Sequence, residues 1–305
     1  MRGLQRSQSA GQDKPASARL GTLWAAAWAA ALLGLAGCGP RLTTLAECEA
    51  KHGGGPRMTV MPPCVDTVRG AMAVEEEYLP GVVDCELGWF TTAAPALEAQ
   101  AIAARTYLGS FLQRHGEDRP VKMTAVFQCW RPPAHARSRH AVQATRDVVM
   151  HADGELLFGN YVAGAKHRDT ECRPLPPSAH KLSGWASWDA MRTAYRQARK
   201  RGDRSPFRGV YWTEILVTEN AGKTGDAVTG TPFARKSPLN RGALSQYGAA
   251  CLAKTKGLET DQILKWFYGD DVVLSRPWSR DDATKLRALE DDGEVEAERP
   301  EVPET

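Results

Sequence analysis

The chain has no apolar run long enough to cross a membrane as a helix. The longest such run, Leu23 to Leu35, covers about thirteen residues, whereas a membrane-spanning helix needs about 20. Around it, the stretch from Leu20 to Gly37 carries no charged residue. Four basic residues precede this stretch: Arg2, Arg6, Lys14 and Arg19. A basic lead-in followed by a short apolar run is typical of a secretory signal peptide.

The apolar run ends in Leu35-Ala36-Gly37-Cys38, which resembles the lipobox of bacterial lipoproteins. The resemblance implies that residues 1–37 are a signal peptide and that the Cys38 thiol takes a diacylglyceryl group. The acyl chains then anchor the protein, at about 0.8 kcal/mol per buried methylene. The alternative is a core helix with a chance cysteine. We expect a lipid-anchored protein of the cell envelope; Gly39 favours the periplasmic face of the outer membrane in a Gram-negative source.

The sequence contains no CxxC pair, which disfavours the common cysteine-based metal sites. With the lipidated cysteine set aside, six remain: Cys48, Cys64, Cys85, Cys129, Cys172 and Cys251. An even set in an oxidising compartment indicates up to three disulfides, with fifteen possible pairings. We expect Cys48 to pair with Cys64, because the loop between them is short. A metal site built from His167, Cys172 and Cys129 is the alternative; otherwise no metal and no cofactor are expected.

Charge is distributed unevenly along the chain, whose net charge is +3. The segment 1–37 carries four basic residues against one acid, and the segment 290–305 carries eight acids against Arg299 alone, which leaves a body of net charge +7. The segment 290–305 has almost no apolar residues, so we expect a disordered acidic tail. A basic body indicates an anionic polymer or surface as partner. Export makes glycan or lipid headgroups the expected partners, rather than nucleic acid.

Helices are predicted from apolar residues at helical spacing. One helix is expected from Leu97 to His115, with Gly116 as its C-cap. Its apolar positions are Leu97, Ala101, Ala104, Leu108 and Phe111. A second helix is expected around Trp188 to Ala198 and would pack one face against the core. That face consists of Trp188, Met191, Tyr195 and Ala198. Two more are expected after Ser245, the first ending near Gly257 and the second running from Thr260, as N-cap, to Gly269.

Two segments are predicted to be β-structure. Residues 143–163 are expected to form a hairpin with Asp153-Gly154 as its turn, and residues 211–218 a further strand. Because helices and antiparallel-looking strands mix without regular alternation, the expected class is α+β. Residues 38–70 are expected to form a linker or a small stapled segment, and residues 71–289 the main domain.

Three blocks of sequence carry a family resemblance when taken in order. The first, Glu75 to Glu86, reads EEEYLPGVVDCE, and the second, Ala96 to Tyr107, reads ALEAQAIAARTY. The third joins LSQYGA at residues 244–249 to ILKWFYG at residues 263–269. Together the blocks span residues 74–270 and resemble the sporulation stage II protein D family, which also contains the amidase-enhancer proteins. The resemblance implies a mixed helix and sheet domain around a glycan-binding groove.

The characterised enzymes of this family are lytic transglycosylases that act on peptidoglycan glycan strands stripped of stem peptides. The resemblance implies that Glu86 is catalytic and cuts between MurNAc and GlcNAc, leaving 1,6-anhydro-MurNAc. One carboxyl then serves as acid and next as base, which requires a raised pKa. We expect Asp84 to add like-charge repulsion and five apolar neighbours to desolvate Glu86, namely Leu79, Val82, Val83, Leu87 and Trp89. The alternative is an exposed helix-end carboxylate, as is expected for Glu75, Glu76 and Glu77.

The second and third blocks supply candidate substrate-binding residues: Gln100, Arg105, Ser245, Gln246 and Tyr247. The Arg105 guanidinium suits the lactyl carboxylate of stripped muramic acid, with a core network as the alternative. Ser245 and Gln246 have hydroxyl and amide groups for sugar hydroxyls, and N-capping is the alternative for Ser245. Three tryptophans are candidates for stacking on sugar rings, with core packing as the alternative for each: Trp130, Trp185 and Trp212.

The chain also departs from the family pattern. Where many relatives have Gly-His-Gly, this chain has Asn240 within Leu239 to Gly242, and Asn240 cannot shuttle protons. Some relatives bind zinc through a His and two Cys before a Q-x-Y motif, but Gln128-Cys129-Trp130 lacks those spaced ligands. The Gly-Gly-x-Thr loop is replaced around residues 161–164. These departures motivate an alternative function, a non-catalytic peptidoglycan-binding module that stimulates an N-acetylmuramoyl-amidase.

Overall fold

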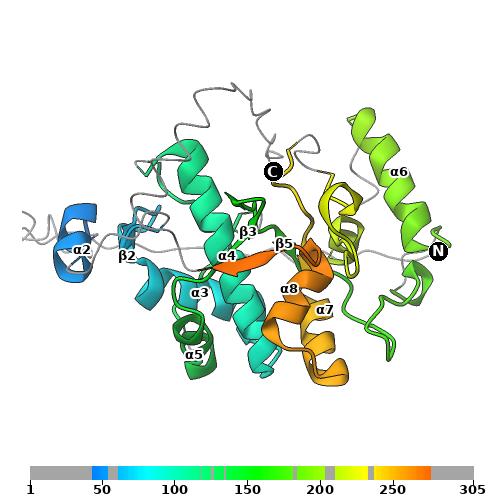
Figure 1. Ribbon diagram of the computed structural model, residues 1–305, viewed down its shortest axis with the longest axis horizontal. Helices are drawn as coiled ribbons and strands as arrows, with labels where there is room; N and C mark the ends of the chain where they lie inside the picture. Colours follow the sequence, from blue (N-terminus) through cyan, green and yellow to red (C-terminus); the bar gives the residue numbers. More distant parts are fainter. Residues whose placement is uncertain are drawn as a thin grey trace, which may run out of the picture. The chain divides into compact units, whose positions relative to one another are not determined.

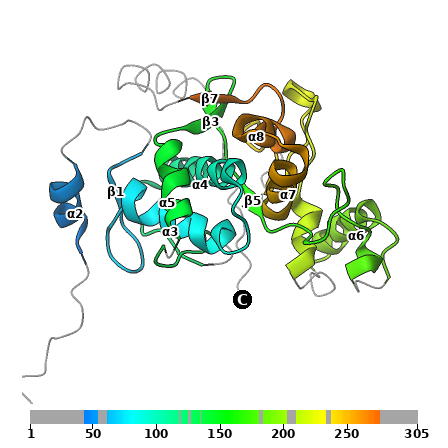
Figure 2. The same ribbon diagram turned by 90° about the horizontal axis from the view of Figure 1, so that it is seen from below.

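The computed structural model describes residues 43–53, 61–117, 119–124, 127–133, 135–180, 184–202, 210–232 and 237–275. All of them belong to the unit that begins at Leu42. The expected signal peptide, Cys38 and the expected acidic tail lie outside these residues. Helices and short strands are mixed (Figures 1 and 2), which confirms the α+β class. Within the described part of the chain, no helix is long and apolar enough to span a membrane.

The helices, in chain order, are α2 (Leu45–His52), α3 (Leu79–Val83), α4 (Ala94–His115), α5 (Ala136–Ala144), α6 (Trp188–Lys200), α7 (Gln246–Cys251) and α8 (Thr260–Tyr268). The strands are β1 (Cys64–Val65), β2 (Met72–Ala73), β3 (Val149–Ala152), β4 (Glu155–Leu156), β5 (Tyr161–Val162), β6 (Leu244–Ser245) and β7 (Val273–Ser275). The π-helical turns of the described residues are η1 (Val74–Tyr78), η2 (Asp84–Gly88) and η7 (Leu252–Lys256). The 3-10 helices described are η3 (Pro177–His180), η5 (Val210–Leu216) and η6 (Gly225–Ala227).

Helix α4 is the element around which the main core forms. Figures 1 and 2 show α3 and α5 on one side of α4, and α7 and α8 on the other, and α4 contacts all four. The predicted apolar positions are all buried, so the predicted helix is confirmed. It begins three residues earlier than expected, with Pro95 in its first turn, where a missing N–H costs no helical hydrogen bond. It ends at His115, and its C-cap is Gly116 as expected, whose φ of +80° suits glycine.

The strands form small sheets beside α4. Antiparallel pairing joins β3 to both β4 and β7, and Asp153 and Gly154 make the tight turn with φ of 53° and 83°. The turn prediction is therefore confirmed, but the hairpin is shorter than expected. Residue 143 lies in α5, and β5 pairs in parallel with β6 instead. The chain bends at Gly159, where an added Cβ would lie 2.6 Å from the Ala103 carbonyl oxygen of α4.

Helix α6 and the 3-10 helix η5 pack together in a second, smaller core. The face of α6 that was expected to be buried is 1–6% exposed at Trp188, Met191, Tyr195 and Ala198. The strand expected at residues 211–218 is wrong, because residues 210–216 are helical. No ladder holds this segment; the Thr213 and Glu214 side chains instead accept hydrogen bonds from the backbone N–H groups of residues 164 and 165.

The two helices after Ser245 follow the prediction closely. The π-helical turn η7 extends α7 to Gly257, which adopts the left-handed conformation expected of a C-cap glycine. Helix α8 ends at Tyr268, with Gly269 as its C-cap, within one residue of the predicted end. Its N-cap is Glu259, in a capping box, rather than Thr260, whose hydroxyl donates to Glu98 at 2.6 Å.

Three disulfides link the six cysteines: Cys48–Cys64, Cys85–Cys129 and Cys172–Cys251. The predicted Cys48–Cys64 pair is confirmed and fastens α2 to β1. The alternative of a metal site on Cys129 and Cys172 is wrong, because both sulfurs are bonded to other cysteines. In the ranges that the structure describes, no group of three or more His, Cys, Asp or Glu side chains is placed to hold a metal ion.

Candidate active site around Glu86

Glu86 lies in the π-helical turn η2, at the end of a continuous helical run over residues 74–88. Single π-helical turns within α-helices occur frequently at functional sites. The run passes close to the chain segment 129–131, and Gly81 makes this approach possible. An added Cβ on Gly81 would lie 2.1 Å from Trp130 Nε1 and 2.7 Å from the Arg131 carbonyl oxygen. Glycine at this position therefore sets the distance between segment 129–131 and the helix that carries Glu86.

Two hydrogen bonds hold the Glu86 carboxylate, one on each oxygen. The Cys129 backbone N–H donates to Oε1 at 2.7 Å, and the Gln246 side chain donates through Nε2 to Oε2 at 2.8 Å. The Cys85–Cys129 disulfide joins the residue before Glu86 to the residue that supplies the first donor. Glu86 itself remains partly exposed. A carboxylate fixed in this way has a defined orientation and is still within reach of a ligand.

Burial raises the pKa of Glu86 above its ordinary value of 4.5, while the hydrogen bonds from Gln246 and Cys129 act in the opposite direction. The net shift is upward, as an acid that must be protonated near neutral pH requires. Four of the five apolar residues expected to desolvate it are fully buried: Leu79, Val82, Val83 and Leu87. The fifth, Trp89, is 54% exposed.

Asp84 does not contribute to the raised pKa of Glu86, contrary to the expectation of like-charge repulsion. Its buried carboxylate accepts hydrogen bonds from Arg131 Nε at 2.7 Å, His135 Nδ1 at 2.7 Å and Ser138 Oγ at 3.0 Å. Burial raises the pKa of Asp84, but the hydrogen bonds from these three side chains outweigh it and lower the pKa to about 2. Asp84 is therefore an ionised structural anchor for segment 131–138.

Tyrosines from separate elements lie near Glu86. The Tyr78 hydroxyl donates to Gln128 Oε1 at 2.6 Å, and Gln128 Nε2 donates to the Ala104 carbonyl oxygen at 3.0 Å. Burial, followed by neighbouring charges that include Glu86, raises the pKa of both Tyr78 and Tyr161. Both phenols thus stay protonated beside the carboxyl group. The sequence analysis did not assign them a role, although Tyr78 belongs to the first block of sequence.

Gln100 is fully buried in α4, and neither its amide nitrogen nor its amide oxygen has a hydrogen-bond partner among the described residues. It shares a helix face with Ala104 and Tyr107, four and seven residues further on. A buried amide without partners is costly unless a ligand or water satisfies it. Its role as a substrate ligand stays a prediction.

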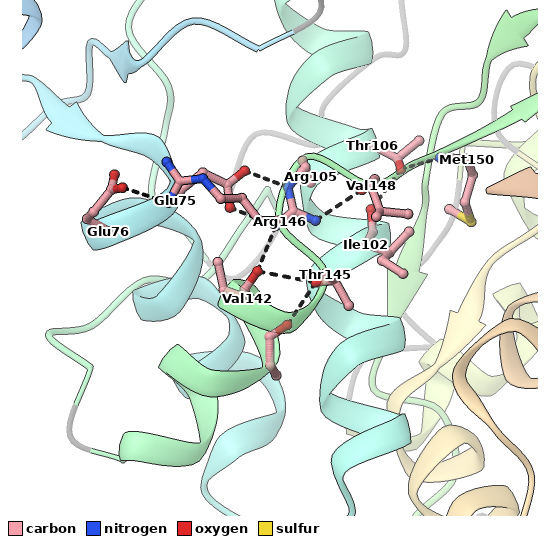
Figure 3. Close-up of polar contacts among 11 residues, drawn as sticks. Glu75, Glu76, Ile102, Arg105, Thr106, Val142, Thr145, Arg146, Val148 and Met150 are labelled. Carbon is pink, nitrogen blue, oxygen red and sulfur yellow. Dashed lines mark hydrogen bonds and ion pairs between the residues drawn. The ribbon is translucent and has the colours of Figure 1, made fainter. Parts of the chain in front are cut away.

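The Arg105 side chain is buried, with 0% of its surface exposed, and Figure 3 shows its polar contacts. Its guanidinium donates to both carboxylate oxygens of Glu75, at 2.7 and 2.8 Å, and to the backbone carbonyls of Val148 and Val142. The structure therefore matches the core-network alternative, because no guanidinium surface is left for a substrate carboxylate. The expectation that Glu75 is exposed is likewise wrong, whereas Glu76 and Glu77 are exposed.

The three candidates of the third block are placed differently from one another. Ser245 is fully buried, accepts from the Gly248 N–H as N-cap of α7, and accepts from Arg168 at 2.6 Å, so it matches the N-capping alternative. Gln246 binds Glu86 directly. Tyr247 is partly exposed, and its ring centroid lies 4.5 Å from that of Phe90.

The remaining candidates from the sequence have structural partners. Asn240 exchanges hydrogen bonds with Thr231, through Oδ1 to the backbone N–H and through Nδ2 to the carbonyl, both at 3.0 Å. Trp130 donates to the Glu77 carbonyl and lies under the Arg69 guanidinium, 5.5 Å from the ring centroid. Trp185 packs against the smaller core. The Trp212 side chain lies outside the described residues.

Residues 69–151 match the SpoIID family model, described as Stage II sporulation protein. The match contains the first two blocks of sequence and therefore Glu86, while Gln246 and the third block lie outside it. A comparison with the curated proteins gives no match. Residues 69–151 are therefore similar to the stage II sporulation protein D family, in the part of the chain that holds the first two blocks of sequence.

Proposed function

We propose that this protein is a lytic transglycosylase that cleaves peptidoglycan glycan strands, with Glu86 as acid and then as base. The match of residues 69–151 to the SpoIID family model supports a peptidoglycan-related role. The observation that carries the finer proposal is the state of Glu86: partly exposed, held by two hydrogen-bond donors, and shifted to a higher pKa by burial. These are the properties that a single carboxyl group needs in order to deliver and then recover one proton.

The proposed reaction balances without water. Protonated Glu86 gives its proton to the glycosidic oxygen, and the bond from that oxygen to C1 of MurNAc breaks. The MurNAc 6-hydroxyl oxygen then bonds to C1, and its proton passes to the Glu86 carboxylate. The products are a free hydroxyl on GlcNAc and a 1,6-anhydro-MurNAc end, and Glu86 returns to its protonated state.

Hydrolysis of a glycoside normally uses two carboxyl groups, one on each side of the bond. The direct hydrogen-bond partners of Glu86 are a backbone N–H and an amide, not a second carboxyl group. The two fully buried carboxylates among the described residues are Asp84 and Glu214, and each is paired with an arginine, at 2.7 and 2.8 Å. This arrangement favours the one-carboxyl reaction.

Gln246 is suited to both protonation states of Glu86. Its Nε2 donates to the ionised carboxylate at 2.8 Å. When Glu86 carries a proton on Oε2, a half-turn of the amide presents the Gln246 carbonyl oxygen as acceptor instead. The same side chain thus keeps Glu86 oriented through the catalytic cycle.

The proposal is tested by comparing wild type with Glu86→Gln on stripped glycan strands, with Glu77→Gln as the control at an exposed carboxyl group. Cleavage should be lost in Glu86→Gln and kept in Glu77→Gln, while both variants still co-sediment with the strands. Cleavage by Glu86→Gln at the wild-type rate would rule out Glu86 as the acid. If neither wild type nor Glu86→Gln cleaves but both bind, the protein is instead the binding module that stimulates an amidase.

We also propose that the protein acts at the cell envelope, anchored through a lipid on Cys38. This proposal rests on the sequence from Leu35 to Cys38 and its basic, apolar lead-in. Cells fed an alkyne-tagged fatty acid should incorporate it into wild type but not into Cys38→Ser. Equal labelling of both proteins would contradict the anchor.

A further inference from the structure

Trp89 is an exposed aromatic residue three positions after Glu86. Three large hydrophobic side chains are largely exposed in the part of the chain that the structure describes, namely Val68, Trp89 and Val273. Trp89 is the aromatic one, with 54% of its surface exposed. Exposing an indole costs free energy in water, and an exposed aromatic residue beside polar groups indicates a binding role.

A row of aromatic rings supports Trp89. Its ring centroid lies 4.9 Å from that of Phe90 in an edge-to-face contact, and the Phe90 centroid lies 4.5 Å from that of Tyr247. Phe90 also packs against the main core. Because Phe90 holds one edge of the indole, the orientation of the exposed part is set before a ligand arrives.

Both ends of this aromatic row are connected to Glu86. Trp89 follows Glu86 in the chain by less than one helical turn. Tyr247, at the other end of the row, is adjacent to Gln246, which donates to Glu86 Oε2. The aromatic row and the hydrogen-bonding groups of the candidate active site therefore occupy neighbouring positions in the chain, at the end of η2 and at the start of α7.

We propose that Trp89 is a stacking platform for one hexopyranose ring of the glycan strand, next to the bond that Glu86 protonates. The apolar C–H face of a sugar ring packs on an indole, while its hydroxyl groups reach the amide and carboxyl groups alongside. This inference rests on the proposed function for the identity of the strand. It assigns to Trp89 the binding role that the sequence analysis considered for other tryptophans.

A glycan fits this surface better than a docked protein does. Protein interfaces have a core of several desolvated apolar side chains. Here one indole is exposed, and its neighbours Phe90 and Tyr247 are only partly so. A single aromatic face flanked by a carboxyl group and an amide has the size and chemistry of a site for one sugar unit.

The test compares Trp89→Ala and Trp89→Phe with Val68→Ala, a control at a side chain that is 60% exposed. All are made in the full chain that also carries Glu86→Gln, so that binding to stripped strands is measured without cleavage. We expect Trp89→Ala to weaken strand binding about tenfold, Trp89→Phe to recover most of it, and Val68→Ala to bind normally. The tryptophan fluorescence of Glu86→Gln should change on strand addition, and that change should shrink in Trp89→Ala.

Binding by Trp89→Ala within about twofold of its parent, with a normal melting temperature, overturns the inference and leaves the proposed cleavage by Glu86 intact. A loss of affinity for a partner amidase, with unchanged strand binding, also overturns it and identifies a protein-docking surface. With Glu86 restored, the platform predicts a larger change in KM than in kcat. If Trp89→Ala loses strand binding while the protein with Glu86 restored and Trp89 unchanged cleaves nothing, the stacking role of Trp89 is supported and the transglycosylase proposal fails.

Discussion

Gln246 donates from Nε2 to Oε2 of Glu86 at 2.8 Å, across 160 positions of sequence. The contact joins the first block of sequence to the third. The Cys129 N–H reaches the other carboxylate oxygen from a segment between the two. Three separate parts of the chain thus converge on one carboxyl group, so a change in any of them alters its orientation and its pKa.

Removal of the Cys85–Cys129 disulfide should reduce both activity and stability. The disulfide fixes the position of the Cys129 N–H, from which Glu86 accepts a hydrogen bond. The Cys85→Ser/Cys129→Ser variant should therefore cleave strands at least tenfold more slowly. The loop entropy of a 44-residue separation is worth about 4 kcal/mol, against about 3 kcal/mol for the 16-residue separation of Cys48–Cys64. The Cys48→Ser/Cys64→Ser variant is therefore the matched control. Equal activity losses in the two variants, at equal melting temperatures, would argue against a role for the Cys129 donor.

Gly81→Ala should impair the site through segment 129–131. The added methyl group cannot fit between Trp130 and the Arg131 carbonyl, so this segment must move and weaken the Cys129 hydrogen bond to Glu86. We expect a loss of about 1–3 kcal/mol of stability, typical of overpacking, and a larger proportional loss of activity. Gly257→Asn is the control, because a Cβ there meets open space and asparagine tolerates the left-handed conformation. Chemical denaturation and strand cleavage measure the two effects, and unchanged activity in Gly81→Ala would contradict the prediction.

Glu86→Gln should be more stable than wild type at neutral pH. Because the folded-state pKa is raised above 4.5, the folded protein binds more protons than the unfolded chain between these two values, and stability falls as pH rises through that window. Glutamine carries no buried charge. At pH 7 the melting temperature of Glu86→Gln should therefore exceed that of wild type, by about 2–4 °C for each kcal/mol by which the charge on Glu86 destabilises the fold. The difference should vanish below pH 4.5. Scanning calorimetry at both values checks this, and a lower melting temperature for Glu86→Gln at pH 7 would show that the carboxylate is stabilising.

Arg105 should affect stability and not glycan recognition. Arg105→Met leaves Glu75 without its buried partner and should cost about 3–5 kcal/mol, whereas the double variant Arg105→Met/Glu75→Leu should regain much of the loss. The exposed pair Arg146–Glu76 is the control, and Arg146→Ala should cost no more than about 1 kcal/mol. Denaturant unfolding gives these values. If the stable double variant loses strand binding, Arg105 recognises the substrate after all.

Local sequence signals predicted the elements whose cause is local. The span of α4 follows from apolar residues at helical spacing and from Gly116, and the Asp153-Gly154 turn follows from its two residue types. The strand prediction for residues 211–218 failed for the opposite reason, since residues 210–216 are helical. Their β-prone sequence is overridden by side-chain contacts of Thr213 and Glu214 with a distant backbone segment, which no local pattern contains.

The candidate site was predicted in part. Glu86 was found through the first block of sequence, and the structure adds the burial and donors that shift its pKa. The partner of Arg105 was not predictable, because a buried and a substrate-facing arginine have the same signature in an alanine-rich helix. The role of Cys129 depends on which of fifteen pairings forms. Trp89 was expected to desolvate Glu86, and its exposure is seen only in the folded structure.

The central claim is that Glu86 drives a cleavage that consumes no water. It is tested most directly by letting the purified protein act on stripped strands in water enriched in heavy oxygen, followed by mass spectrometry of the fragments. The account predicts anhydro-muramic ends without heavy oxygen in wild type, and no new ends in Glu86→Gln. Reducing muramic ends that carry heavy oxygen would show hydrolysis, and new ends of either kind in Glu86→Gln would contradict the assigned role of Glu86.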